Sequence, residues 1–208
     1  METVDRRINK SKKALKEALI VLMKEKEFKK ITITEIVDFA DLNRGTFYKH
    51  YQYKEDLLDE VIEDVFADLK DSYRAPYHNN AMFFEERLST SAIKIFDHVY
   101  KFSNFYTIII KANGLPGFPS RICEVLKELA INDGLLDQLD SSIDKEIYAS
   151  YHAYSLLGMI VEWVNGGFKY TSHHMAEQLL QIISTTNRSS YKMTDLESSA
   201  KERKSLID

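Results

Sequence analysis

One short stretch constrains the fold of this chain more than any other: residues 32–54, TITEIVDFADLNRGTFYKHYQYK. Thr32 and Glu35 have the S/T-x-x-E spacing of a capping box, in which each side chain bonds a free backbone amide at a helix start. A short apolar stripe follows, made of Ile36, Val37, Phe39 and Ala40. We therefore expect a short helix that begins directly after Thr32.

A second short helix is expected from Arg44 to His50, because Asn43 in front of it is a good N-cap residue. Leu42, Phe47 and Tyr51 are spaced to pack inward, which leaves one side of this helix polar. That side carries Arg44, Thr46, Tyr48, Lys49 and His50. Two short helices joined by a tight turn, the second with outward donors, are typical of a DNA-reading helix-turn-helix. Taken alone, the second helix is equally compatible with an ordinary solvated surface.

The run N-R-G-T-F-Y-K-H-Y, followed by K-E-D-L-L, resembles the DNA-binding domain of the TetR family of bacterial repressors. T-I-T-E-I-V-D-F-A resembles the preceding helix of that domain, and the resemblance extends over residues 15–58. The family usually has glycine at the turn, where this chain has Asp41, a residue that tolerates the left-handed conformation. The resemblance implies a transcriptional regulator, most often a repressor, that binds a palindromic double-stranded operator.

The residues expected at the DNA divide by role. Arg44 and Thr46 are expected at base edges, and Gly45 close to the DNA, where a side chain would hold the helix off. The remaining contacts, chiefly to phosphates, are expected from Thr32, Asn43, Tyr48, Lys49, His50 and Lys54. Lys54 also opens a helix, so its side chain and the first amides are together candidates for holding one phosphate.

Composition agrees with a helical protein that meets DNA at one end. Of the 208 residues, 44% are apolar and 29% are charged, which are globular proportions. Residues 1–56 contain 13 basic and 10 acidic residues, whereas the remainder contains 15 and 22. A weakly basic head on an acidic body suits a protein that touches phosphate with one end. The first helix adds a basic cluster, which fits phosphate contact or a solvated face equally well: Arg6, Arg7, Lys10, Lys12, Lys13 and Lys16.

We predict an all-α protein in two parts. An N-terminal three-helix helix-turn-helix domain (1–56) precedes a C-terminal helical domain for ligand binding and dimerisation (57–186) and a polar tail (187–208). Helical periodicity predicts helices over residues 5–27, 54–72, 82–102, 104–111, 120–132, 144–165 and from 172 onward. The helix over 144–165 is apolar on almost all sides, so it must be buried on all sides. We therefore expect a homodimer through residues 148–164 and 172–184, with Ile160 and Ile183 near its centre.

Aromatic side chains are the main chemical feature of the body. Buried tyrosine hydroxyls need partners, and several converging tyrosines suit a pocket with a few polar groups. The expected lining consists of Phe96, Tyr100, Tyr106, Phe118, Tyr151 and Tyr154, with His98 and His152 to orient a polar atom. Residues 104–111 are the expected roof and residues 114–119 the rim. The expected ligand is small and mostly apolar or aromatic. For both histidines, a satisfied core histidine is the simpler interpretation.

No motif for catalysis, a cofactor or a metal is visible, and adjacent His173 and His174 are poorly placed as joint ligands. One cysteine, Cys123, fits a reducing cytosol. The start METVDRRINKSKK lacks a secretory h-region, and the apolar run 151–164 is too short to span a bilayer, so we expect a cytoplasmic protein without a membrane partner. Two alternatives remain. The first is a helical enzyme, for which no converging acid, base or metal-binding groups are apparent. The second is a DNA-binding protein without a small-molecule ligand, either controlled by a protein partner or purely architectural, and a solid core in the body would favour it.

Overall fold

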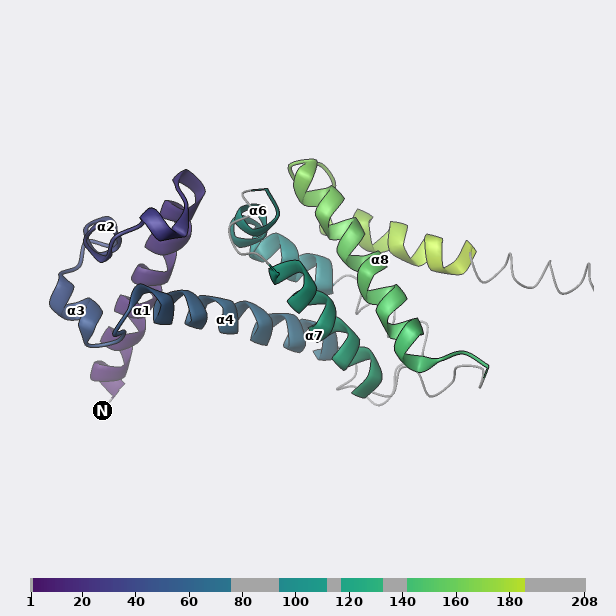
Figure 1. Cartoon of the computed structure of the whole chain (residues 1–208), viewed down its shortest axis with the longest axis horizontal. Coiled ribbons are helices and arrows are strands. Elements are labelled where there is room, and N and C mark those ends of the chain that lie inside the picture. Colours follow the sequence, from purple (N-terminus) through teal and green to yellow (C-terminus); the bar gives the residue numbers. More distant parts are fainter. Residues whose placement is uncertain (1, 76–93, 112–116, 133–141, 186–208) are drawn as a thin grey trace, which may run out of the picture.

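The computed structural model describes residues 2–75, 94–111, 117–132 and 142–185. The head contains α1 (Glu2–Glu25), a 3-10 turn η1 (Phe28–Lys30), α2 (Ile33–Phe39) and α3 (Arg44–Tyr48). A long helix, α4 (Lys54–Arg74), leads from the head into the body (Figure 1). The body contains a helix over residues 94–101, α6 (Ser103–Lys111), α7 (Phe118–Asn132), α8 (Lys145–Asn165) and a helix over 172–185. The predicted all-α fold is confirmed.

The head is organised around a small core in which α1 packs against α2 and α4. Phe47 of α3 is fully buried there, together with Leu15, Leu19, Ile36 and Leu57. Phe39 was expected in the inward stripe of α2, but its side chain is 55% exposed. The reason is the helical period: Ile36, Val37 and Ala40 define the inward arc, and Phe39 lies about 110° from its centre.

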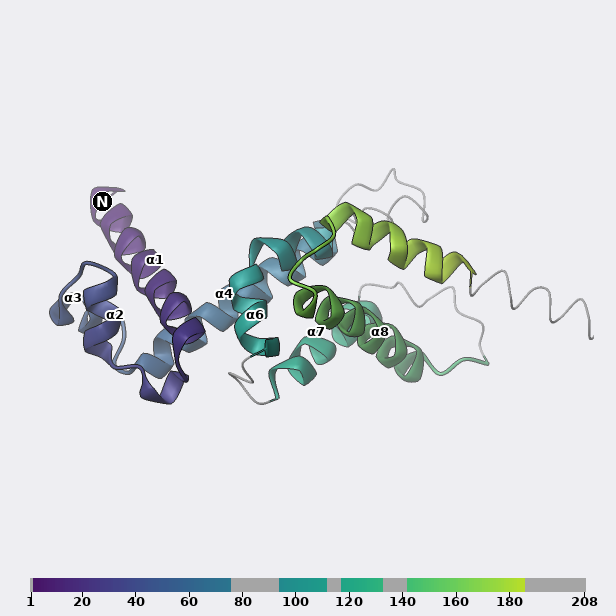
Figure 2. The same ribbon diagram turned by 90° about the horizontal axis from the view of Figure 1, so that it is seen from above.

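Helix α4 runs from the head into the body (Figure 2), and the two parts also meet directly where α1 packs on α6. One face of α4 is buried along its whole length. In the head, Lys12 of α1 binds Glu60 at 2.8 Å, and Lys16 binds Glu60 and Asp64 at 2.6 Å each. Toward the body, Phe66 stacks on Phe118 of α7, with 5.1 Å between the ring centroids. The predicted domain boundary at residue 56 thus falls inside a continuous helix.

Helix α8 packs on α7 and α6 with only one of its faces. The buried face consists of Ala149, Ala153, Leu156, Leu157, Ile160, Trp163 and Val164. The opposite face exposes 71% of Ile147, 62% of Tyr151 and 61% of Tyr154. The body therefore covers only part of the apolar surface of α8. Ile160, however, is only 1% exposed within its own subunit, so its expected place at a dimer centre is wrong.

A chain of polar groups, of which His98 and Tyr106 are buried and Asp68 is partly exposed, joins α4, the 94–101 helix and α6. His98 Nδ1 lies 2.7 Å from Oδ2 of Asp68, and Nε2 lies 3.0 Å from the Tyr106 hydroxyl. Burial lowers the pKa of His98, which favours the neutral ring, and burial raises the pKa of Tyr106. Because an ionised carboxylate only accepts, Nδ1 donates to Asp68 and Tyr106 donates to Nε2. His98 is thus a core histidine with both nitrogens satisfied.

Several predicted boundaries shift. α1 ends at Glu25, α4 continues to Arg74, and α7 begins at Phe118 rather than at Ser120. The start of the last helix at residue 172 is as predicted. Expectations for residues 82–93, for most of the pocket rim and for the tail lie outside the described residues. Within the ranges that the structure describes, no helix is long and apolar enough to cross a membrane.

Replacing Tyr106 with Phe should destabilise the protein, because Nε2 of buried His98 would lose its donor without gaining water. We expect the free energy of unfolding to fall by about 1–3 kcal/mol, measured by urea denaturation at pH 7. Tyr100→Phe is the matched control, since that side chain is 58% exposed. Equal losses in the two variants would contradict the assigned role of Tyr106.

Candidate nucleic-acid interface

The first helix of the motif begins with the expected capping box. Thr32 Oγ1 accepts from the Glu35 amide at 3.2 Å, and Glu35 Oε2 accepts from the Thr32 amide at 2.9 Å. The Lys26 ammonium, together with the Thr32 amide and hydroxyl, lowers the pKa of Glu35 to about 2. Thr32 was expected at the DNA surface; it is exposed, but its hydroxyl is already engaged in this cap.

The turn between α2 and α3 is built as the sequence predicted. Asp41 has a φ of 53°, the left-handed conformation in which the related family usually has glycine. Asn43 Oδ1 then accepts from the Thr46 amide at 2.8 Å and from the Thr46 hydroxyl at 3.2 Å. The predicted N-cap is confirmed, and it fixes the direction in which α3 leaves the turn.

The outer side of α3 presents a compact set of polar groups. Arg44, Tyr48 and Lys49 are exposed, whereas Phe47 anchors the helix from the opposite side. Arg44 Nη2 lies 3.4 Å from the Tyr48 hydroxyl, which steadies the guanidinium while leaving most of its donors free. Asn43 uses its Oδ1 in the cap, so its amide nitrogen remains as a donor. These groups can bind phosphate oxygens and base acceptors.

The local geometry favours glycine at position 45. A Cβ built at this position would lie 3.2 Å from Oδ1 of Asn43, closer than most Cβ contacts. A side chain would therefore crowd the oxygen that caps α3. The sequence had suggested a different reason, that a side chain would hold the helix away from DNA.

His50 connects the end of α3 to α1. Its Nε2 lies 2.8 Å from Ser11 Oγ, and Ser11 donates its single hydroxyl hydrogen to the Ile8 carbonyl at 2.9 Å. His50 must then be the donor in its bond to Ser11. Burial and the nearby charges of Lys12 and Lys49 lower the pKa of His50, which favours the neutral ring. The expected phosphate contact by a basic His50 is therefore replaced by a contact within the head.

At the start of α4, the Lys54 side chain and the two backbone amides that precede the helix are already engaged within the chain. Lys54 Nζ donates to the carbonyls of Phe28, Lys29 and Ile31 at 2.9, 3.1 and 2.7 Å. Asp56 Oδ2 accepts from the amides of Gln52 and Tyr53 at 2.9 and 2.8 Å. The expectation that the Lys54 side chain holds a phosphate is corrected accordingly.

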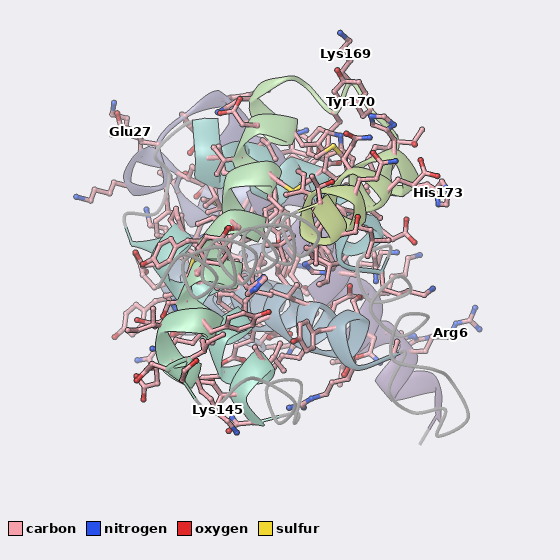
Figure 3. All side chains as sticks on the ribbon, turned by 90° about the vertical axis from the view of Figure 1, so that its right-hand side faces the viewer. Arg6, Glu27, Lys145, Lys169, Tyr170 and His173 are labelled. Atoms are coloured by element: carbon pink, nitrogen blue, oxygen red, sulfur yellow. The ribbon has the colours of Figure 1, made fainter. Side chains whose placement is uncertain are left out.

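The basic cluster of α1 separates by partner, and Lys13 lies 3.8 Å from Glu17 of the same helix. Lys12 and Lys16 bind acidic residues of α4, and are thereby committed to the head. Arg6, Arg7 and Lys10 are exposed and form no ion pair with any residue that the structure describes. Figure 3 shows Arg6 extending away from the rest of the molecule. Because Ser11 contacts His50, this end of α1 lies beside the end of α3.

The residues predicted to line one ligand pocket do not converge. Phe96, Tyr106 and Phe118 are buried in the packed core, where Phe118 contacts Phe66 and Phe105. Tyr100 lies at the surface with its ring 6.2 Å from that of Trp163. His98 is satisfied by Asp68 and Tyr106, and the ring of His152 packs 4.3 Å from that of Tyr148.

Of that predicted set, Tyr151 and Tyr154 border a hollow formed by residues that the structure describes. The hollow is open, has a volume of about 400 Å³, and is completed by Ile147, Ser150 and Glu146 of α8 and Lys127 of α7. It lies on the exposed face of α8. In the described part of the chain, no three or more His, Cys, Asp or Glu residues are grouped so that they could hold a metal ion.

Comparison with known proteins agrees with this geometry. A family model described as "Bacterial regulatory proteins, tetR family" matches residues 11–61. A second TetR model, described as "Transcriptional regulator C-terminal region", matches residues 86–185. The uncharacterized HTH-type transcriptional regulator YxbF of Bacillus subtilis (strain 168) is 28% identical over 181 residues, which are 86% of this chain and 46% of that protein. The chain thus spans about half the length of this curated relative.

Two solved structures share the fold. A TetR transcriptional regulator from Streptococcus agalactiae 2603V has 25% identity and a TM-score of 0.61, covering 88% of this chain and 98% of its own. The fatty acid degradation regulator FadR from Bacillus halodurans has 16% identity and a TM-score of 0.66, covering 83% and 93%. The two family models together match well over half of the chain. This protein belongs to the TetR family of transcriptional regulators.

Proposed function

We propose that this transcriptional regulator is a homodimer that represses by occupying a palindromic operator, and that a small, mostly apolar or aromatic ligand releases it. The observation that carries the proposal is the division of donors in the head. Lys12, Lys16, His50 and Lys54 are engaged inside it, whereas Arg44, Tyr48 and Lys49 remain exposed on one capped helix. Such a helix fits the major groove. The alternative of a helical enzyme is not supported, because the family consists of regulators.

Contacts to bases and phosphates are assigned by reach and donor geometry. Arg44, near the start of α3, has a planar fork of donors that suits guanine, and Thr46 lies one residue beyond Gly45. Tyr48, Lys49 and the amide of Asn43 are assigned to phosphates, which position the helix without reading sequence. Arg6, Arg7 and Lys10 extend the phosphate contacts along α1, a role that their exposure supports.

Arg44→Ala should change specificity, whereas Lys49→Ala should change affinity alone. We expect Arg44→Ala to weaken binding to the preferred operator by about 1–3 kcal/mol and to relax one base position per half-site. Lys49→Ala should weaken binding to all sequences and reduce the salt slope by about one. The preferred operator is first selected from random duplexes, and affinities are measured by fluorescence anisotropy. An Arg44→Ala protein with unchanged base preference would rule out base reading by Arg44.

The dimer is proposed to form through the exposed face of α8 and the 172–185 helix, the side of the body that faces the viewer in Figure 3. Ile147, Tyr151, Tyr154 and Gly158 follow one another at spacings of four, three and four residues, so they form one line along α8. Ile182 of the last helix is also exposed. Family members act as dimers, and two heads related by a twofold axis meet successive major grooves about 34 Å apart.

Gly158→Arg should separate the subunits without disturbing the fold of either. A Cβ at this position meets no atom within 4 Å, so the larger side chain clashes only with a partner. Glu128→Arg, at an exposed position of α7, is the matched control with the same final side chain. Sedimentation should show a monomer for Gly158→Arg and a dimer for Glu128→Arg. A dimeric Gly158→Arg protein would place the interface elsewhere.

Release by a ligand is proposed to act through α4, whose second half is part of the body core. Of the predicted lining, Tyr151 and Tyr154 remain as candidates because they border the hollow between α7 and α8, which the proposed dimer interface would also cover. The only tryptophan, Trp163, contacts Phe96 and Phe168 with ring separations of 5.6 and 5.0 Å, so its emission reports on the body.

Neutral aromatic and acyl compounds can be screened by Trp163 fluorescence and then tested in the operator assay. A releasing ligand should lower operator affinity about a hundredfold, equivalent to about 2.7 kcal/mol of coupling between the two sites. A nonspecific duplex provides the control. Compounds that bind the body and leave operator affinity unchanged would favour control by a protein partner instead.

A further inference from the structure

Lys54 is the first residue of α4, yet its side chain turns back toward the connection between α1 and α2. Its ammonium reaches three backbone carbonyls, of Phe28, Lys29 and Ile31, at 2.7–3.1 Å. The Phe28 ring centroid lies 4.7 Å from the same nitrogen. The partners lie 23 to 26 residues earlier in the chain, so this is a tertiary contact.

The number of donors decides what else this lysine can bind. An ammonium has three N–H groups and no acceptor, and here three carbonyls take all three. A cation at the start of a helix is also opposed by the helix dipole, which the partial negative charges of these carbonyls offset. No N–H of Lys54 is left for a phosphate oxygen unless a bond within the head is broken.

The carbonyls belong to the segment that leads directly into the helix-turn-helix. Ile31 immediately precedes Thr32, whose side chain caps α2. At its other end, α4 is held in the body by the bond between Asp68 and His98 and by the stacking of Phe66 on Phe118. A displacement of α4 therefore acts on the start of α2 through Lys54.

We propose that Lys54 is a positioning residue, a latch that fixes α4 to the η1 turn and so sets the orientation of the helix-turn-helix on the linking helix. It contacts no DNA. The proposal rests on the DNA-binding function proposed above in one of its two tests, the measurement of operator affinity; the other test, hydrogen exchange, does not depend on it.

Two variants of the full chain separate a latch from a phosphate contact. Lys54→Met keeps an unbranched stem over Phe28 and removes all three donors, whereas Lys54→Arg keeps the charge but has a planar fork that cannot match three converging carbonyls. The first readout is hydrogen exchange at the amides of Ile31 and Ile36, which bond the carbonyls of Phe28 and Thr32. The second is operator affinity as a function of salt.

In both variants, the hydrogen-exchange rates of these amides should rise at least about tenfold over those of the unmodified chain, because local opening becomes easier. Both should bind the operator more weakly, with an unchanged salt slope. Lys49→Met is the control: its slope should fall by about one while exchange stays normal. An unmodified chain that binds no operator would remove the proposed function and leave the exchange test intact.

Normal exchange in both Lys54 variants would overturn the latch. Full affinity in Lys54→Arg together with a slope reduced by about one in Lys54→Met would instead identify a phosphate contact. If Lys54→Met does not fold, Lys54→Arg decides alone: accelerated exchange supports the latch, and normal exchange contradicts it.

Discussion

The continuous burial of one face of α4, from the head into the body, is the constraint on which the rest of the structure depends. Leu57 and Leu58 are buried in the head, and Phe66 is stacked in the body, all on one continuous face. A helix that is fixed at both ends transmits displacement, because packed cores shift between discrete arrangements instead of deforming smoothly. Polar contacts set the register at each end. The partly exposed Lys12–Glu60 and Lys16–Asp64 pairs contribute little stability individually, so their value lies in orientation.

The recognition helix illustrates how little of its stability is its own. α3 has five residues, far too few to persist alone, because helix nucleation outweighs the bonds that so short a segment forms. The Asn43 cap fixes its start, and buried Phe47 attaches it to the core. His50 attaches the residues that follow it to α1. The exposed side chains of α3 therefore keep their positions because the rest of this short helix is fixed by contacts with the head.

The electrostatic character of the head depends on pairing more than on net charge. Residues 1–56 are only weakly basic in composition, with 13 basic and 10 acidic residues. Lys12 and Lys16 form ion pairs with acidic residues of α4, which neutralises two of these positive charges at the surface of the head. Arg44 and Lys49 at α3 and Arg6, Arg7 and Lys10 near the start of α1 have no acidic partner among the described residues, and neither does Lys29 of η1. Affinity for DNA should accordingly depend on the few unpaired side chains and on salt.

The sequence by itself determined the features whose partners lie within about one helical turn. The Thr32–Glu35 box, the left-handed Asp41 and the Asn43 cap were all predictable, since each bond closes within five residues. The tertiary structure decided which predicted site residues are free. Lys54 and His50 have partners 23 to 39 residues away, and no local pattern reveals such partners. The aromatic residues of the body scattered for the same reason: periodicity predicts that a side is apolar, but only helix packing decides whether that side meets a core, a hollow or solvent.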